Sequence, residues 1–270
     1  MAQRVKSLLD ELKELGGYYN CPRGEDGRRL GPLVGYAGTY KAPDGQKKQK
    51  VGDVYANFAK MEEQPIRMMP FVRILGRKIE ERLDELYPEW DIDVFLGAPE
   101  GGKALAGLLA LESQKLHLSD EGAKYIYPEK EILELKTTAS REKSQLVFSR
   151  HELEEGKRVV IVEDVCNNFS TTDSLIRLVQ ECGSEVLAIA CLLNRSMTVG
   201  NVYQYVENPT SIRSEIKKIP VIAIKMQGIA DYRQDDPAVA DDVAAGNVVW
   251  KPKDKDGWPH LMTAMTKAVK

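Results

Sequence analysis

The chain has 270 residues, of which 43% are hydrophobic, so it is long enough to bury a sizeable core in one large domain or two small ones. Its 38 basic and 41 acidic side chains give a net charge of −3, and this balance excludes a strong global attraction to nucleic acid or to an anionic membrane. The four cysteines show no zinc-ligand spacing, and we expect a reduced, cytoplasmic protein with no signal peptide or membrane span.

The first 63 residues predict a small unit that precedes the main domain. Apolar spacing through Met1–Leu15 predicts an amphipathic helix that ends at two glycines. Residues 20–50 are rich in Gly, Pro, Asp and Lys and predict loops around a short strand at 33–36. A second strand is expected at 53–58, and both strands would belong to a small β-layer.

Residues 64–227 predict the main domain, because helical and strand patterns alternate there. Helices are expected at 64–87, 103–113 and 173–182, and strands at 92–96, 124–127, 132–136, 158–163, 185–193 and 219–224. The polar stretch 137–150 predicts a loop. This alternation is typical of an α/β fold with a mainly parallel, twisted sheet and helices on both faces.

Residues 228–270 depart from that pattern and form a tail. An acidic helix is expected over 235–245, and a final helix begins at Pro259. We expect Trp250 and Trp258 to pack this tail against the main body, which gives three segments in all.

The end of the strand at 158–162 carries the most informative chemistry. Its apolar residues run directly into Glu163 and Asp164, and the small polar residues 165–172 follow before a helix. Adjacent carboxylates can accept hydrogen bonds from ribose hydroxyls, and backbone N–H groups at a helix N-terminus can hold a phosphate. The alternative is a helix-capping acid with a neighbour, which would need only one carboxylate.

A second loop of related character follows the strand at 92–96. Gly97–Gly102 consists mostly of small residues, which allow the backbone to approach a ligand closely. An ordinary strand-to-helix turn is the alternative. Because ligands of α/β folds bind at the carboxyl ends of the parallel strands, both loops are candidate ligand sites.

Together these pieces resemble a type I phosphoribosyltransferase, most closely the orotate phosphoribosyltransferase branch. The signature is the apolar strand, acid pair and polar loop that run from Val159 to Thr171. In that family the acids bind the ribose hydroxyls of phosphoribosyl pyrophosphate (PRPP) and the loop binds its 5′-phosphate. The resemblance implies ribose binding by Glu163 and Asp164, and 5′-phosphate binding by Asn167, Asn168, Phe169, Ser170 and Thr171.

The same resemblance implies the remaining site residues. The pyrophosphate loop corresponds to Ala98, Pro99, Glu100, Gly101 and Gly102. The flexible catalytic loop corresponds to residues 136–150, with Lys136, Arg141 and Lys143 as catalytic cations beside Asp164. The resemblance also implies that residues 1–63 form an N-terminal helix and a hood over the base. The base would be bound by Arg195, after the strand at 185–193, and by Phe58 and Lys60 of the hood.

The activity implied is transfer of ribose 5-phosphate from PRPP to a nucleobase nitrogen. Orotate is favoured because a guanidinium such as that of Arg195 pairs with a carboxylate, and the products would be orotidine 5′-monophosphate and pyrophosphate, in pyrimidine biosynthesis. Mg²⁺ is the implied cofactor, held mainly by PRPP, and a homodimer is the implied assembly.

This sequence departs from the family pattern at two places. Asn167, Asn168 and Phe169 stand where the phosphate loop usually has Thr and Gly, and residues 136–150 contain no His. Two alternatives therefore stay open: a PRPP- or nucleotide-binding regulator without turnover, and a phosphoribosyltransferase for another base.

Overall fold

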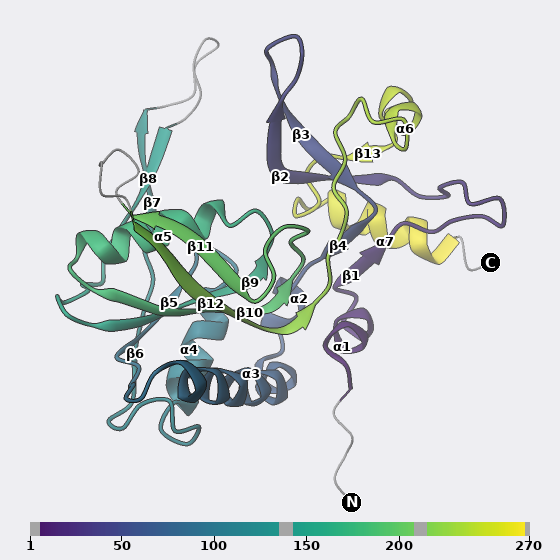
Figure 1. Ribbon diagram of the computed structural model, residues 1–270. Helices are drawn as coiled ribbons and strands as arrows, with labels where there is room; N and C mark the ends of the chain where they lie inside the picture. The colour runs from purple at the N-terminus through teal and green to yellow at the C-terminus, as the bar shows by residue number, and fades with distance from the viewer. Residues whose placement is uncertain (1–5, 135–142, 208–214, 268–270) are drawn as a thin grey trace, which may run out of the picture. The chain divides into compact units, whose positions relative to one another are not determined.

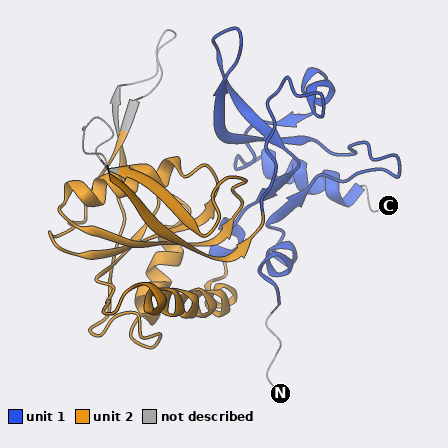
Figure 2. Ribbon diagram, viewed as in Figure 1, with its two compact units in different colours: residues 1–63, 228–270 blue, residues 64–227 orange. Residues whose placement is uncertain are grey.

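The computed structural model describes residues 6–134, 143–207 and 215–267, which form two compact units. Figure 2 colours unit 1, residues 1–63 and 228–270, in blue and unit 2, residues 64–227, in orange. None of the helices in the described ranges is both long enough and apolar enough to cross a membrane.

Unit 2 is built on a six-stranded sheet with the order β11-β12-β10-β9-β5-β6. All neighbouring strands are parallel except β11, which runs antiparallel to β12 at the edge. The strands are β5 (Val94–Gly97), β6 (Lys124–Ile126), β9 (Arg158–Cys166), β10 (Glu185–Asn194), β11 (Val202–Glu207) and β12 (Glu215–Met226). The predicted α/β fold with a mainly parallel sheet is confirmed.

Helices cover both faces of this sheet (Figure 1). α3 (Pro65–Leu86) and α4 (Lys103–Glu112) pack against each other and on one face, whereas α5 (Ser170–Glu181) packs on the other. α3 ends because Tyr87, the residue before Pro88, is extended, as a residue before proline tends to be.

The core of unit 2 explains the apolar strand in the middle of the sequence. Val159, Val160, Ile161 and Val162 of β9 are fully buried, since helices cover both faces of this central strand. Buried parallel strands of this kind have continuous apolar runs, and Glu163 and Asp164 are the first polar residues after this run, still within β9.

Three elements of unit 2 differ from the sequence expectation. The predicted loop at 137–150 contains β8 (Lys143–Val147), which pairs antiparallel with β7 (Glu129–Glu134). α5 begins at Ser170, three residues earlier than predicted. β11 was not expected, although its Val-Tyr-Gln-Tyr-Val sequence alternates as an edge strand does.

Unit 1 combines the two ends of the chain. Its elements are α1 (Leu8–Glu14), β1 (Tyr18–Asn20), β2 (Leu33–Lys41), β3 (Lys47–Gly52), β4 (Val54–Ala56), α2 (Ala59–Glu62), α6 (Ala240–Ala244), β13 (Val248–Val249) and α7 (Gly257–Lys267). β3 stands where a loop was predicted, because its lysine-rich strand pairs with β2.

The tail belongs to unit 1 through backbone pairing and packing. β13 adds a parallel strand to β2, and the indole of Trp258 packs with Tyr19 and Val34 in the core of this unit. The indole Nε1–H also donates to the Gly16 carbonyl at 3.0 Å. The three segments expected from the sequence are therefore two units.

Candidate functional site

The acid pair lies at the carboxyl end of β9, between the neighbouring strands β5 and β10. Val162 is opposite Gly97 of β5, and Glu163 is opposite Cys191 of β10. Both acidic residues are half-buried, and the Asp164 carboxylate accepts a hydrogen bond of 2.7 Å from the Val165 N–H. The pair thus stands at the edge where α/β folds bind ligands.

Glu163 lies in an environment that disfavours its charge. Burial and the adjacent Asp164 carboxylate raise the pKa of Glu163 well above the ordinary value of 4.5. Contact with Cys191 and burial likewise raise the pKa of the Cys166 thiol, which favours its neutral form. Hydrogen bonds from the hydroxyl groups of a ligand would stabilise the charged form of the Glu163 carboxyl.

The loop at 97–102 lies directly against the acid pair. The Ala98 N–H donates to the Val162 carbonyl at 2.8 Å, and the Gly102 N–H donates to the Ala98 carbonyl at 2.9 Å. A methyl group on Gly101 would overlap the Asp164 carboxylate, and one on Gly102 would overlap the Val162 carbonyl. The peptide bond between Pro99 and Glu100 is cis. The loop at 97–102 therefore lies beside the acid pair of β9.

The proposed 5′-phosphate loop leads into α5. The Asn168 side-chain oxygen accepts hydrogen bonds from the Ser170 N–H at 3.2 Å and the Ser170 hydroxyl at 3.0 Å. Ser170 and Thr171 open the helix, where backbone N–H groups have no acceptor within the helix. The Ser170 N–H is therefore taken up by Asn168, at the positive end of the helix dipole.

Phe169 anchors that loop with its side chain turned into the core. It has a left-handed backbone, with φ of 57°, and its ring is only 3% exposed. The ring stacks on Tyr203 of β11 at 4.8 Å between centroids, and the Tyr203 hydroxyl donates to Asp173 at 2.6 Å. The large side chain therefore does not occupy the side of the loop where its backbone could contact a ligand.

Arg195 follows β10 at the same edge of the sheet. Its N–H donates to the Cys166 carbonyl at 2.9 Å, so its backbone is held beside the end of β9. Its side chain is 6% exposed. The Asn194 side chain donates to the carbonyls of Val199 and Gly200 and so holds the loop between β10 and β11.

The other residues named from the sequence lie outside the described residues, in β8 or in unit 1. Lys136 and Arg141 lie outside the described residues, and Lys143 is the first residue of β8. Phe58 and Lys60 belong to unit 1. Phe58 is 1% exposed, and Lys60 forms an exposed ion pair with Glu63 at 2.7 Å.

Sequence reasoning missed two residues next to the loops. Tyr203 holds Phe169, and the alternating pattern of β11 was the signal that could have revealed it. Lys103 is the first residue of α4, and its ammonium lies 3.2 Å from the Glu100 carboxylate. The signal for Lys103 was a basic residue at the start of a helix, directly after a loop of small residues.

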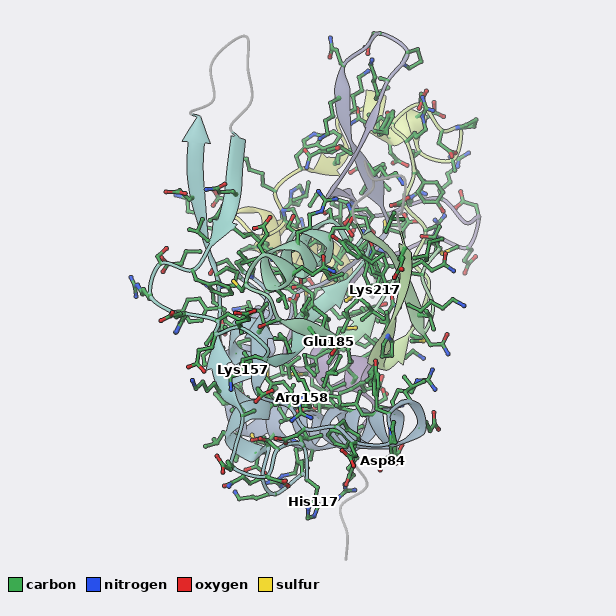
Figure 3. All side chains as sticks on the ribbon, turned by 60° about the vertical axis from the view of Figure 1, so that its left-hand side comes forward. Asp84, His117, Lys157, Arg158, Glu185 and Lys217 are labelled. Carbon is green, nitrogen blue, oxygen red and sulfur yellow. The ribbon has the colours of Figure 1, made fainter. Side chains whose placement is uncertain are left out.

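The opposite edge of the sheet is occupied by ion pairs. Lys157, Arg158 and Glu185, labelled in Figure 3, lie at the amino ends of β9 and β10. Lys157 and Arg158 both pair with Asp93, at 3.6 and 3.4 Å. These ion pairs hold the amino ends of the strands, whereas the candidate ligand-binding loops lie at the carboxyl edge.

A family model supplies the decisive comparison. The model of the phosphoribosyl transferase domain matches residues 67–225, which is more than half of the chain. The chain belongs to the type I phosphoribosyltransferase family. The matched range includes the acid pair, both loops and Arg195, so these residues lie within the family domain.

Individual relatives carry different names within this family. The transcriptional regulator GfcR of Methanocella arvoryzae is 25% identical over 56% of this chain and 69% of its own length. Orotate phosphoribosyltransferase 2 of Mesorhizobium japonicum is 33% identical over 35% of this chain and 42% of its own length. The solved orotate phosphoribosyltransferase from Aeropyrum pernix aligns at 15% identity over 80% of this chain and 92% of that one, with a TM-score of 0.43.

The acid pair is also the part of this phosphoribosyltransferase that could meet a metal ion. Within the described ranges, no group of three or more His, Cys, Asp or Glu residues is placed to hold one. Asp164 offers a half-buried carboxylate beside Gly101, which suits an ion that arrives with its own ligands better than a resident ion.

Proposed function

We propose that this chain transfers ribose 5-phosphate from PRPP to a nitrogen of orotate, releasing pyrophosphate. The observation that carries the proposal is the close approach of Gly101 to the Asp164 carboxylate, which joins the acid pair and the second loop in one site. One ligand that carries a ribose and a pyrophosphate would meet both. The α5 N-terminus at Ser170 would take the 5′-phosphate.

The reaction is a displacement at the anomeric carbon. The bond from that carbon to the pyrophosphate oxygen breaks, and its electron pair leaves with pyrophosphate. A bond to the base nitrogen forms, and the proton of that N–H is released to solvent or to pyrophosphate. Glu163 and Asp164 would hold the ribose hydroxyls, and the Asp164 carboxylate would stabilise positive charge that develops on the ring. The remaining contribution is positioning by the two loops, so no protein nucleophile is needed.

Asp164 is the residue that would contact a Mg²⁺ ion bound to PRPP. Such an ion supplies positive charge to the departing pyrophosphate. The proposed roles of Lys136, Arg141, Lys143, Phe58 and Lys60, the homodimer and the cytoplasmic location stay predictions that follow from the family resemblance.

Arg195 supports orotate as the base. A buried guanidinium at the carboxyl edge is suited to pair with the carboxylate that distinguishes orotate from other pyrimidines. The test is a panel of nucleobases with PRPP and Mg²⁺, scored by release of pyrophosphate. We expect release with orotate, and Arg195→Ala should raise the KM for orotate about tenfold or more, as expected for a lost charge-assisted pair.

Absence of release with every base would reject the transferase proposal. Release with a purine but not with orotate would support the transferase reaction and show that the base is a purine. Unchanged orotate kinetics in Arg195→Ala would remove the role given to that residue.

A second candidate is a PRPP- or nucleotide-binding regulator. It is favoured by the Asn168–Ser170 contacts, which take up a helix N-terminal N–H in the phosphate loop, and by the similarity to a transcriptional regulator. Tight binding of PRPP without pyrophosphate release from any base would support this function over the enzyme.

A further inference from the structure

Lys103 stands where the pyrophosphate loop meets helix α4. It is the first residue of the helix and directly follows Gly102. From Gly97 to Glu112 it is the only basic residue in the sequence. A ligand anion at this loop would therefore find its nearest cation along the chain in Lys103.

Two contacts hold the Lys103 ammonium beside the loop. It lies 3.2 Å from the Glu100 carboxylate and 4.6 Å from the centroid of the Tyr127 ring. Tyr127 follows β6, next to the end of β5, and His151 packs edge-on against it at 4.5 Å. The aromatic face thus supports the cation from the side of β6.

Local stability does not account for a lysine at this position. A cation in the first turn of a helix faces the positive end of the helix dipole, which is unfavourable. The Glu100 partner is 84% exposed, and an exposed ion pair contributes little to folding. The Lys103 side chain is 26% exposed, so it is partly accessible to a ligand.

We propose that Lys103 binds the pyrophosphate group of PRPP, exchanging the Glu100 carboxylate for a pyrophosphate oxygen. Tyr127 is a positioning residue that keeps the ammonium over the loop. The exchange replaces a weak, solvated partner with a more highly charged one, which favours it. This inference rests on the proposed function, because it requires PRPP as the ligand.

The test compares ligands with and without pyrophosphate. Binding of PRPP, inorganic pyrophosphate and ribose 5-phosphate, each with Mg²⁺, is measured by calorimetry for the full chain and for Lys103→Met. We expect about a tenfold or larger increase in the Kd of PRPP and of pyrophosphate, as for loss of one charge-assisted hydrogen bond. The Kd of ribose 5-phosphate should not change.

Two further variants control for charge and folding. Lys103→Arg keeps the charge and should bind PRPP within about threefold of the unaltered protein. Lys115→Met removes an exposed lysine, 72% exposed, just beyond the other end of the same helix and should leave all three Kd values unchanged.

The positioning role of Tyr127 has its own comparison. Tyr127→Phe keeps the ring and should bind PRPP as the unaltered protein does. Tyr127→Leu should weaken PRPP and pyrophosphate binding without affecting ribose 5-phosphate, a selectivity that a general loss of stability would not produce.

The outcomes separate this inference from the proposed function. If the unaltered protein binds PRPP and Lys103→Met binds it equally well, Lys103 has no such role, and the proposed function stands. If Lys103→Met weakens ribose 5-phosphate to the same degree, its effect is not on pyrophosphate, and the inference fails. If the unaltered protein binds neither PRPP nor ribose 5-phosphate, both proposals fall.

Discussion

Glu163 shows how one residue of the site is placed at a cost to stability. Burial and Asp164 raise its pKa, so the folded state prefers the protonated carboxyl. The unfolded chain titrates near the ordinary value of 4.5, and the folded state therefore binds more protons above that pH. The contribution of Glu163 to the free energy of unfolding therefore falls as pH rises from about 4.5 toward the raised pKa.

Glu163→Gln should remove this penalty. We expect the variant to be more stable than the unaltered protein near neutral pH, with a Tm higher by about 2–4 °C for each kcal/mol regained. The gain should vanish below pH 4.5, where the carboxyl is protonated in both states. The same variant should bind PRPP more weakly, since an amide is a poorer acceptor for ribose hydroxyls.

Thermal unfolding across pH checks the prediction. The exposed Glu89→Gln is the matched control and should show no such gain. A Tm difference for Glu163→Gln that is independent of pH would contradict the assignment of the raised pKa.

At the scale of elements, the site depends on how two loops meet strand β9. Gly101→Ala would place a methyl group on the Asp164 carboxylate, so we expect a loss of PRPP affinity of about tenfold or more. Gly107→Ala, within α4, is the matched control, because its methyl group would meet only the Tyr125 ring at 3.5 Å. That control should stabilise the helix by about 1 kcal/mol. Equal PRPP affinity in both variants would refute the proposed contact.

The contact between the α5 loop and β11 gives a second expectation at this scale. Loss of the buried Phe169 ring in Phe169→Ala should lower the free energy of unfolding by about 3–5 kcal/mol. Because φ is 57°, alanine is also strained there and glycine is not. Phe169→Gly should therefore be no less stable than Phe169→Ala, the reverse of the usual order. Denaturant unfolding measures both, and a markedly less stable glycine variant would contradict the left-handed conformation.

At the scale of the whole molecule, unit 1 is closed by the two ends of the chain. The Arg29 guanidinium, 9% exposed, pairs with Asp53 from the N-terminal segment and with Asp242 from the tail, and it donates to the Ala238 carbonyl. It therefore joins segments separated by the entire phosphoribosyltransferase domain.

Arg29→Ala should destabilise unit 1 by about 3–5 kcal/mol, because two carboxylates would lose their buried partner. Arg23 also pairs with Asp53 but is 45% exposed, and Arg23→Ala should cost less than about 1 kcal/mol. Denaturant unfolding of the full chain, followed by tryptophan fluorescence of Trp250 and Trp258, compares the two variants. Similar losses of stability in Arg29→Ala and Arg23→Ala would show that the ion pairs of Arg29 do not hold the tail in unit 1.

The sequence by itself determined the family fold, the strand before Glu163 and the loop at 97–102, because buried parallel strands leave continuous apolar runs and their ends leave polar residues. It missed β8 and β11, since their strand state depends on pairing with a neighbour. Only the tertiary structure decided that Phe169 points into the core, that Lys103 faces Glu100, and that the tail completes unit 1. Each of these is a contact between elements, and no local pattern encodes which distant partner an element finds.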